Sequence, residues 1–153
     1  MIKRTVETLD QSGQPDWVLD IVSSCDEQTL AVSMGSRALC FHDSETLKRV
    51  SSVWGAHTGR INCIESSRSN PHLVMTSAED KLVKYWDSRS SSAIGAVLQF
   101  KFTDEVESAS MGLQDSLLAA ATGNILKFAD SRKAQESSGG SCSDGTRPTK
   151  VLG

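Results

Sequence analysis

Short segments in the middle of the chain alternate between hydrophobic and polar residues. Residues 60–65 and 82–86 show this alternation, and residues 73–76 form an apolar run that ends in a hydroxyl. Segments of this length and pattern predict β-strands. Loop-forming residues at 67–72 and a tight-turn sequence at 78–81 separate them. The pattern therefore predicts three consecutive strands joined by short connections.

The same pattern occurs on both sides of this stretch. Asp-Ser pairs begin at Asp43, Asp87 and Asp130, at separations of 44 and 43 residues, and an apolar block precedes each pair. A period of about 40–45 residues is typical of four-stranded propeller blades. Further strands are expected at residues 17–22, 29–33, 38–42, 47–51, 93–102, 106–111, 117–121 and 125–129. A short helix over residues 115–121 is an alternative, because Leu and Ala are strong helix formers, but the repeat register favours a strand.

The motifs in the middle segment resemble those of the WD-repeat (WD40, β-transducin) family. A Gly-Ala-His triplet begins at Gly55, and a Trp-Asp pair ends at Asp87. In that family such motifs bracket three of the four strands of a blade. The resemblance implies a buried, structural hydrogen-bonded relay made by His57, Thr76, Asp80 and Trp86. These four polar side chains would satisfy one another's hydrogen bonds, and no second ligand at metal-binding spacing accompanies His57.

We therefore expect an all-β fold, a partial β-propeller of about three four-stranded antiparallel blades with the third incomplete. The expected divisions are a lead-in at 1–14, a degenerate blade at 15–54, an intact blade at 55–102, a partial blade at 103–132, a Ser/Gly-rich flexible loop at 133–149 and the start of a truncated strand at 150–153. Residues 150–152 of that last segment would begin the fourth strand of the third blade.

The two flanking blades lack parts of the relay. His42 stands where the first blade would have the Trp, no Asp occupies its turn, and Ala129 replaces the Trp in the third blade. Two and three-quarter blades cannot close a ring, so remaining blades are expected to be missing from the chain. Three explanations stay open: the N-terminal part of a longer propeller, a truncated product, or a ring completed by oligomerisation.

Composition narrows the function classes. The chain has 153 residues, of which 38% are hydrophobic and 23% charged, with a formal net charge of −3. This charge predicts neither nucleic acid nor a membrane as the main partner, and no run of about 18 apolar residues is present. The four cysteines form no C-x-x-C pair and are expected to be free thiols of an intracellular protein, cytoplasmic or nuclear. No catalytic motif is found, so we expect neither an enzyme nor a cofactor.

The family resemblance implies a rigid platform that binds other proteins. Its top-face loops would include Gly55, His57, Thr58, Arg60, Glu79 and Lys81. The bland alternative is that the charges in these loops are merely solvated. Two other functional alternatives remain: a truncated or non-functional fragment, and a docking module with a phosphorylatable Ser-rich tail.

Residues 74–89, VMTSAEDKLVKYWDSR, resemble the Trp-Asp-x-Arg box of WD-repeat substrate receptors of cullin-4 ubiquitin ligases. In those receptors the Arg projects to the ligase adaptor. The resemblance therefore implies an adaptor contact at Asp87 and Arg89, with Arg132 as a second copy that lacks the Trp. Asp-x-Arg also occurs in blades that bind no ligase.

Overall fold

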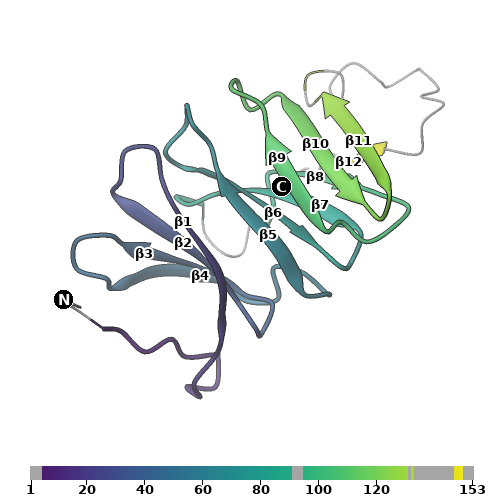
Figure 1. The fold of residues 1–153 in the computed structure, drawn as a ribbon. Helices are drawn as coiled ribbons and strands as arrows, with labels where there is room; N and C mark the ends of the chain where they lie inside the picture. The colour runs from purple at the N-terminus through teal and green to yellow at the C-terminus, as the bar shows by residue number, and fades with distance from the viewer. Residues whose placement is uncertain (1–4, 91–94, 131, 133–146, 150–153) are drawn as a thin grey trace.

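The computed structural model of the chain describes residues 5–90, 95–130, 132 and 147–149. The strands form three antiparallel sheets, which we call blades, that follow one another in chain order (Figure 1). The expected all-β class is confirmed. The helix considered for residues 115–121 is wrong, because residues 117–122 form a strand that is paired on both sides.

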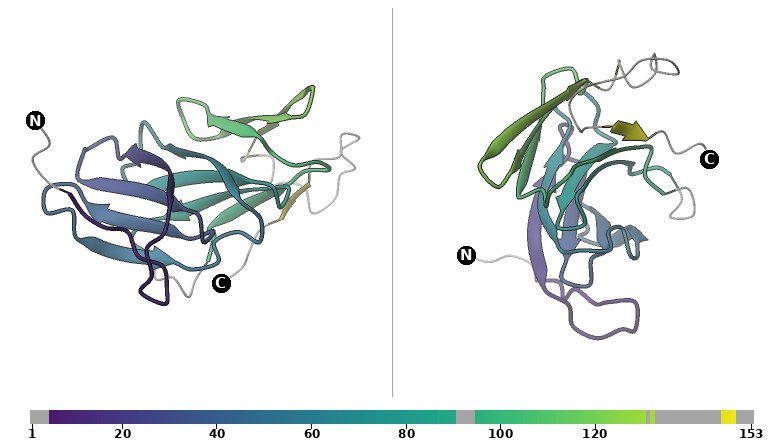
Figure 2. Two further views of the ribbon diagram at one scale, coloured as in Figure 1. Left: turned by 60° about the horizontal axis from the view of Figure 1, so that its bottom comes forward. Right: turned by 90° about the vertical axis from the view of Figure 1, so that its right-hand side faces the viewer.

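Most strands pair with their neighbours in sequence. Blade 1 contains β1 (Val18–Ser23), β2 (Thr29–Met34), β3 (Leu39–Asp43) and β4 (Arg49–Val53). Blade 2 contains β5 (Ile61–Ser66), β6 (Leu73–Ala78), β7 (Leu82–Asp87) and β8 (Leu98–Lys101). Blade 3 contains β9 (Ser108–Met111), β10 (Leu117–Thr122) and β11 (Ile125–Asp130). The last strand, β12 (Arg147–Thr149), pairs with β8 and adds a fifth strand to blade 2 (Figure 2).

Two fourth strands begin later than the alternation predicts. In blade 1, Leu47 has a φ of +59°, which is a turn conformation, so the strand begins at Arg49 instead of residue 47. In blade 2, Gly95 has a φ of +73°, and the strand begins at Leu98 instead of residue 93. Residues 93 and 94 themselves lie outside the described part of the chain.

The prediction for the C-terminal segment is partly wrong. Residues 147–149 were expected to belong to a flexible loop, but they form β12 on the outer edge of blade 2. Their composition by itself is typical of a loop. The strand with which they pair lies almost fifty residues earlier in the chain, and local sequence pattern carries no information about so distant a partner. Residues 133–146, and residues 150–153 with the strand expected there, lie outside the described residues.

The core between blades 1 and 2 is one continuous apolar layer. Blade 1 contributes Ala31, Leu39 and Phe41, each at most 2% exposed, and they pack in one cluster with Val74 and Trp86 of blade 2. The two cross-strand residues Ala31 and Phe41 are directly opposed in the register of β2 and β3, so they share one face of the sheet. Alternation along the strands therefore aims this face at blade 2.

The opposite face of blade 2 packs on blade 3. Met75, Val83 and Tyr85 lie in one buried cluster with Leu118 and Ala120 of β10. The directly opposed pair Met75 and Tyr85 takes the same place in blade 2 that Ala31 and Phe41 take in blade 1. The β10 residue Ala120 in this cluster is small and 1% exposed.

The outward face of blade 3 repeats this arrangement in an exposed position. Ala119 is directly opposed to Phe128, and Ala121 to Leu126. Phe128 is 71% exposed and Leu126 is 69% exposed. Residues that are buried between blades in the rest of the structure are therefore open on this face.

Candidate functional site

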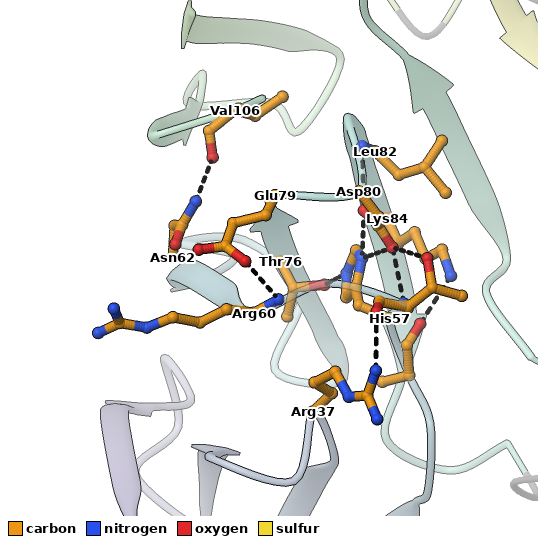
Figure 3. Close-up of polar contacts among 12 residues, drawn as sticks. Arg37, His57, Arg60, Asn62, Thr76, Glu79, Asp80, Leu82, Lys84 and Val106 are labelled. Atoms are coloured by element: carbon orange, nitrogen blue, oxygen red, sulfur yellow. Dashed lines mark hydrogen bonds and ion pairs between the residues drawn. The ribbon is translucent and has the colours of Figure 1, made fainter. Parts of the chain in front are cut away.

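The four residues of the predicted relay lie in one hydrogen-bonded series inside blade 2. Figure 3 shows three of them, His57, Thr76 and Asp80. Trp86 Nε1 donates to Thr76 Oγ1 at 2.7 Å. Thr76 Oγ1 lies 2.7 Å from His57 Nε2, and His57 Nδ1 lies 2.9 Å from Asp80 Oδ2. Asp80 also accepts the backbone N–H of Thr58 at 2.9 Å and that of Leu82 at 3.2 Å.

The chemistry of the indole determines the direction of the whole series. Trp86 Nε1 is only a donor, so the Thr76 hydroxyl must accept from it. The single hydroxyl hydrogen of Thr76 is then donated to Nε2 of a neutral His57. The remaining ring proton of His57 lies on Nδ1, where it is donated to the Asp80 carboxylate. Each donor in the series thus has an acceptor, and the relay ties the loop before β5 to β6, β7 and the turn between them.

Burial determines the ionisation of the relay. It lowers the pKa of His57 below its ordinary value of 6.5, and the hydrogen bond and charge of Asp80 offset this only in part. Burial also acts to raise the pKa of Asp80, but the hydrogen bonds from His57 and from the backbone outweigh it and keep this pKa below 3.8. The relay is therefore a neutral imidazole beside a carboxylate at neutral pH.

Blades 1 and 3 cannot form the relay. By the register of the paired strands, Val32 in blade 1 and Ala120 in blade 3 occupy the position of Thr76. His42, which replaces the Trp in blade 1, instead places its Nδ1 3.1 Å from the carbonyl oxygen of Leu47. Among the described residues, blade 2 alone contains all four groups.

The expected top-face residues come together around the relay. Gly55 and Thr58 are exposed in the loop before β5, while His57 between them is buried. Arg60 N donates to Glu79 Oε2 at 3.2 Å, and Glu79 N donates to the Arg60 carbonyl oxygen at 3.0 Å. These contacts join the loop to the turn between β6 and β7.

That turn also reaches blade 3. Exposed Lys81, with a φ of +68°, donates from Nζ to the carbonyl oxygen of Thr103 at 3.0 Å. The structure thus brings the predicted top-face residues together at one end of blade 2.

Sequence reasoning missed two residues of this region. Arg37 of blade 1 donates from Nη1 to the Thr58 carbonyl oxygen at 2.9 Å and joins the two blades. Lys84 donates to the Ala56 carbonyl oxygen at 2.6 Å and lies over the Trp86 ring, 5.6 Å from its centroid. Burial lowers the pKa of Lys84. The 44-residue repeat, which is visible in the sequence, aligns Arg37 with Lys81. The structure gives both residues a positive φ, +66° for Arg37 and +68° for Lys81.

The two Asp-x-Arg sequences form matched ion pairs. Arg89 donates from Nε and Nη2 to the two carboxylate oxygens of Asp87, at 3.1 and 2.7 Å. Arg132 binds both oxygens of Asp130 in the same way, at 3.1 and 3.0 Å. The Arg89 and Arg132 side chains stay 64% and 66% exposed. The hydrogen bond and charge of Arg89 lower the pKa of Asp87, so this pair remains ionised at neutral pH.

Metal-binding clusters and membrane-spanning helices are both absent from the described residues. No group of three or more His, Cys, Asp and Glu residues in this part of the chain is arranged to hold a metal ion. No helix there is long and apolar enough to cross a membrane.

The three blades, their repeat spacing and the relay define the class of protein. The fold is that of part of a β-propeller, and the repeat spacing and the relay resemble those of WD40-repeat propellers, which generally act as protein-interaction scaffolds. No protein-family model matches the chain.

Parts of the chain are similar in sequence to several curated relatives. The chain is 28% identical over 99 residues to the ribosome biogenesis protein YTM1 of Coprinopsis cinerea, a match that covers 63% of this chain and 21% of that protein. It is 44% identical over 52 residues to the U5 small nuclear ribonucleoprotein 40 kDa protein of Homo sapiens, which covers 34% of this chain and 14% of that protein. The LEC14B protein of Lithospermum erythrorhizon is 28% identical over 86 residues, 56% of this chain and 18% of that protein. The matches thus span about a fifth or less of these relatives.

Solved structures show the same fold. A chain of the Mitotic Checkpoint Complex superimposes with a TM-score of 0.67 and 20% identity, over 80% of this chain and 36% of that chain. The β-propeller domain of Myceliophteria thermophila Cps50 (Swd1) superimposes with a TM-score of 0.66 and 15% identity, over 88% of this chain and 39% of that chain. These structural likenesses show that the chain has the fold of part of a β-propeller.

Proposed function

We propose that the chain is a non-catalytic protein-interaction scaffold that binds the adaptor subunit of a cullin-4 ubiquitin ligase through Arg89. The observation that carries this proposal is the preorganised guanidinium beside the Trp86-Asp87 pair. Asp87 holds Arg89 with two side-chain hydrogen bonds, and the Arg89 backbone N–H adds a third at 2.9 Å. The side chain loses little further rotamer freedom on binding, which lowers the entropic cost of association.

Arg132 provides a second contact of the same design. Its backbone N–H donates to Asp130 Oδ1 at 3.0 Å, as that of Arg89 does to Asp87. Asp87 and Asp130 occupy equivalent ends of β7 and β11, each opposite the first residue of the neighbouring strand. A partner that binds this side of the protein would meet two guanidinium groups with the same local geometry.

The comparisons support a role in larger assemblies. Two of the relatives are named for ribosome biogenesis and for a small nuclear ribonucleoprotein, and one of the similar structures is a complex. We also propose that the chain corresponds to the N-terminal blades of a protein like WD repeat-containing protein 89. The order of its motifs, His-Asp, then Trp-Asp-x-Arg, then a polar insertion, resembles that protein. We place the protein in the cytoplasm or nucleus. The Ser-rich tail, the basis of the alternative docking function, lies mostly outside the described residues.

Binding of the full chain to the purified cullin-4 adaptor tests the proposal. Arg89→Ala is expected to weaken binding by about tenfold or more, because the guanidinium that Asp87 holds in place for the partner is lost. Arg89→Lys keeps the charge but not the fork, and is expected to restore binding only in part. Arg60→Ala, an exposed arginine in the top-face loop, is the matched control and should bind like wild type. Equal binding of wild type and Arg89→Ala, or no binding by either, rejects the adaptor role.

A further inference from the structure

The outer edge of blade 2 carries a strand from a distant part of the chain. In a sheet, the last strand presents unpaired N–H and C=O groups to any extended segment that reaches it. Here the chain itself supplies the segment: β12 pairs antiparallel with β8, with Arg147 opposite Lys101, Pro148 opposite Phe100 and Thr149 opposite Gln99. Figure 2 shows β12 beside the strands of blade 2. The β8 edge therefore already accepts an added strand.

Backbone alternation shows which groups of β8 face β12. Phe102 N donates to the Lys81 carbonyl oxygen at 2.8 Å, in continuation of the register in which Val83 is opposite Phe100. Hydrogen-bonded and non-bonded pairs alternate along an antiparallel ladder. Phe100 therefore directs its backbone groups to β7, whereas Gln99 and Lys101 direct theirs to β12.

The position of Pro148 agrees with this alternation. It is opposite Phe100, so the N–H that proline lacks would point away from β8. Proline at such a position breaks no bond of the ladder, and it leaves the outer side without a donor for yet another strand. Residues 147 and 149, which are not proline, take the two positions at which a donor is needed. The sequence of β12 thus fits a terminal strand in this register.

The cis strand is nevertheless a weak occupant. It is only three residues long, and its register places a basic residue, Arg147, directly opposite exposed Lys101. Like charges at directly opposed positions weaken a strand pair, and opposite charges strengthen it. A segment with an acidic residue at that position would pair better with β8.

We propose that the β8 edge is a docking site for an extended peptide of a partner protein, which adds as an antiparallel strand with an acidic residue opposite Lys101 and a proline opposite Phe100. Residues 147–149 occupy this site within the chain until such a peptide replaces them. Recognition is by backbone hydrogen bonds, with specificity from the charge opposite Lys101. This surface is separate from the Asp-x-Arg contacts.

Residue-resolved hydrogen exchange of the full chain tests the cis pairing. In wild type the amides of Gln99 and Lys101 should be protected. Thr149→Pro removes an inward-pointing donor and should release β12, so the protection of both amides should fall by about tenfold or more. The Phe100 amide, bonded to β7, should stay protected and so reports that blade 2 is intact. Pro148→Ala changes only the outward position and is the matched control, with protection like that of wild type.

Two five-residue peptides test the trans site on the Thr149→Pro chain. Thr-Arg-Pro-Thr-Lys copies the cis segment, and Thr-Glu-Pro-Thr-Lys places an acid opposite Lys101. Both should restore protection of Gln99 and Lys101 at millimolar concentration, the Glu peptide at a concentration about threefold lower. Wild type should need more peptide, because the tethered strand competes.

Three results overturn the proposal. The first is unprotected Gln99 and Lys101 amides in wild type. The second is equal loss of protection in Pro148→Ala and Thr149→Pro. The third is no protection by either peptide, or tighter binding of the Arg peptide.

Discussion

Two adjacent buried hydroxyls in β6 provide a sharp test of the relay. Thr76 Oγ1 contacts both Trp86 Nε1 and His57 Nε2, each at 2.7 Å, and Thr76 is 0% exposed. Ser77, also 0% exposed, has an Oγ with no hydrogen-bond partner among the described residues. The same chemical change, loss of a buried hydroxyl, should therefore lower stability at Thr76 but not at Ser77.

Thr76→Val keeps the shape of the side chain but leaves the indole N–H and the imidazole Nε2 buried without partners. An unsatisfied buried polar group costs about 1–3 kcal/mol, so two of them should lower the free energy of unfolding by about 2–5 kcal/mol after partial relaxation. Ser77→Ala removes a hydroxyl whose desolvation is uncompensated. It should leave the free energy unchanged within about 0.5 kcal/mol, or raise it by up to about 1 kcal/mol.

Urea unfolding followed by tryptophan fluorescence measures both values. Trp86 is 3% exposed and reports on blade 2, whereas Trp17 is 82% exposed and should change little. A double-mutant cycle of Thr76→Val with Trp86→Phe isolates the Thr76–Trp86 coupling; circular dichroism follows the unfolding of all four proteins, because two of them lack the Trp86 fluorophore. The reasoning is refuted if Ser77→Ala costs as much as Thr76→Val, or if the cycle gives a coupling energy near zero.

Three further predictions concern the same structure. Trp86→Ala should lower the free energy of unfolding by about 3–5 kcal/mol through the cavity and the broken relay; an unchanged melting temperature would contradict the burial of Trp86. The pKa of folded His57 lies below 6.5 and that of folded Asp80 below 3.8, so the unfolded chain binds more protons than the folded chain on acidification. The free energy of unfolding should therefore be highest above about pH 6.5 and fall as the pH decreases, with a smaller loss near pH 6 in His57→Gln. Urea midpoints between pH 7 and pH 4 measure this, and a rise in stability on acidification would contradict it. Phe128 is 71% exposed and Phe41 is 2% exposed, so Phe128→Ser should change the free energy of unfolding by less than about 0.5 kcal/mol and Phe41→Ser should lower it by about 3 kcal/mol or more. Calorimetry measures both values, and equal losses would show that the two blade faces are equally buried.

Local sequence pattern predicts the strands of blade 2 well, because the sequence of this blade contains both the short-range signals of strands and turns and the spaced motifs. Alternation identifies β5 and β7, and the Asp80 turn separates β6 from β7. The family resemblance carried by the spaced motifs also implies that His57 and Trp86 are relay members, although they lie 29 positions apart in sequence. Periodicity and turn chemistry are local properties, and each blade is assembled mainly from neighbouring segments.

Contacts between segments that are distant in sequence are much harder to predict. Arg37 and Lys84 matter because their donors reach backbone carbonyl groups of the loop before β5, and alternation says nothing about such contacts. The pairing of β12 with β8 is invisible for the same reason, since residues 133–149 have the composition of a loop. The start of β8 depends on the positive φ of Gly95, which a strand-like apolar pattern conceals.

The repeat also shows that position in the stack, more than residue type, determines how much each blade face contributes to stability. Ala31 and Phe41 of blade 1, and the equivalent Met75 and Tyr85 of blade 2, are each at most 2% exposed because a following sheet covers them. The equivalent Phe128 of blade 3 is 71% exposed. Near-neighbour packing of this kind makes stability a sum of blade and interface contributions. Blade 2 has a covered sheet face on both sides and the complete relay, so it should be the last part of the described structure to lose its amide protection on heating.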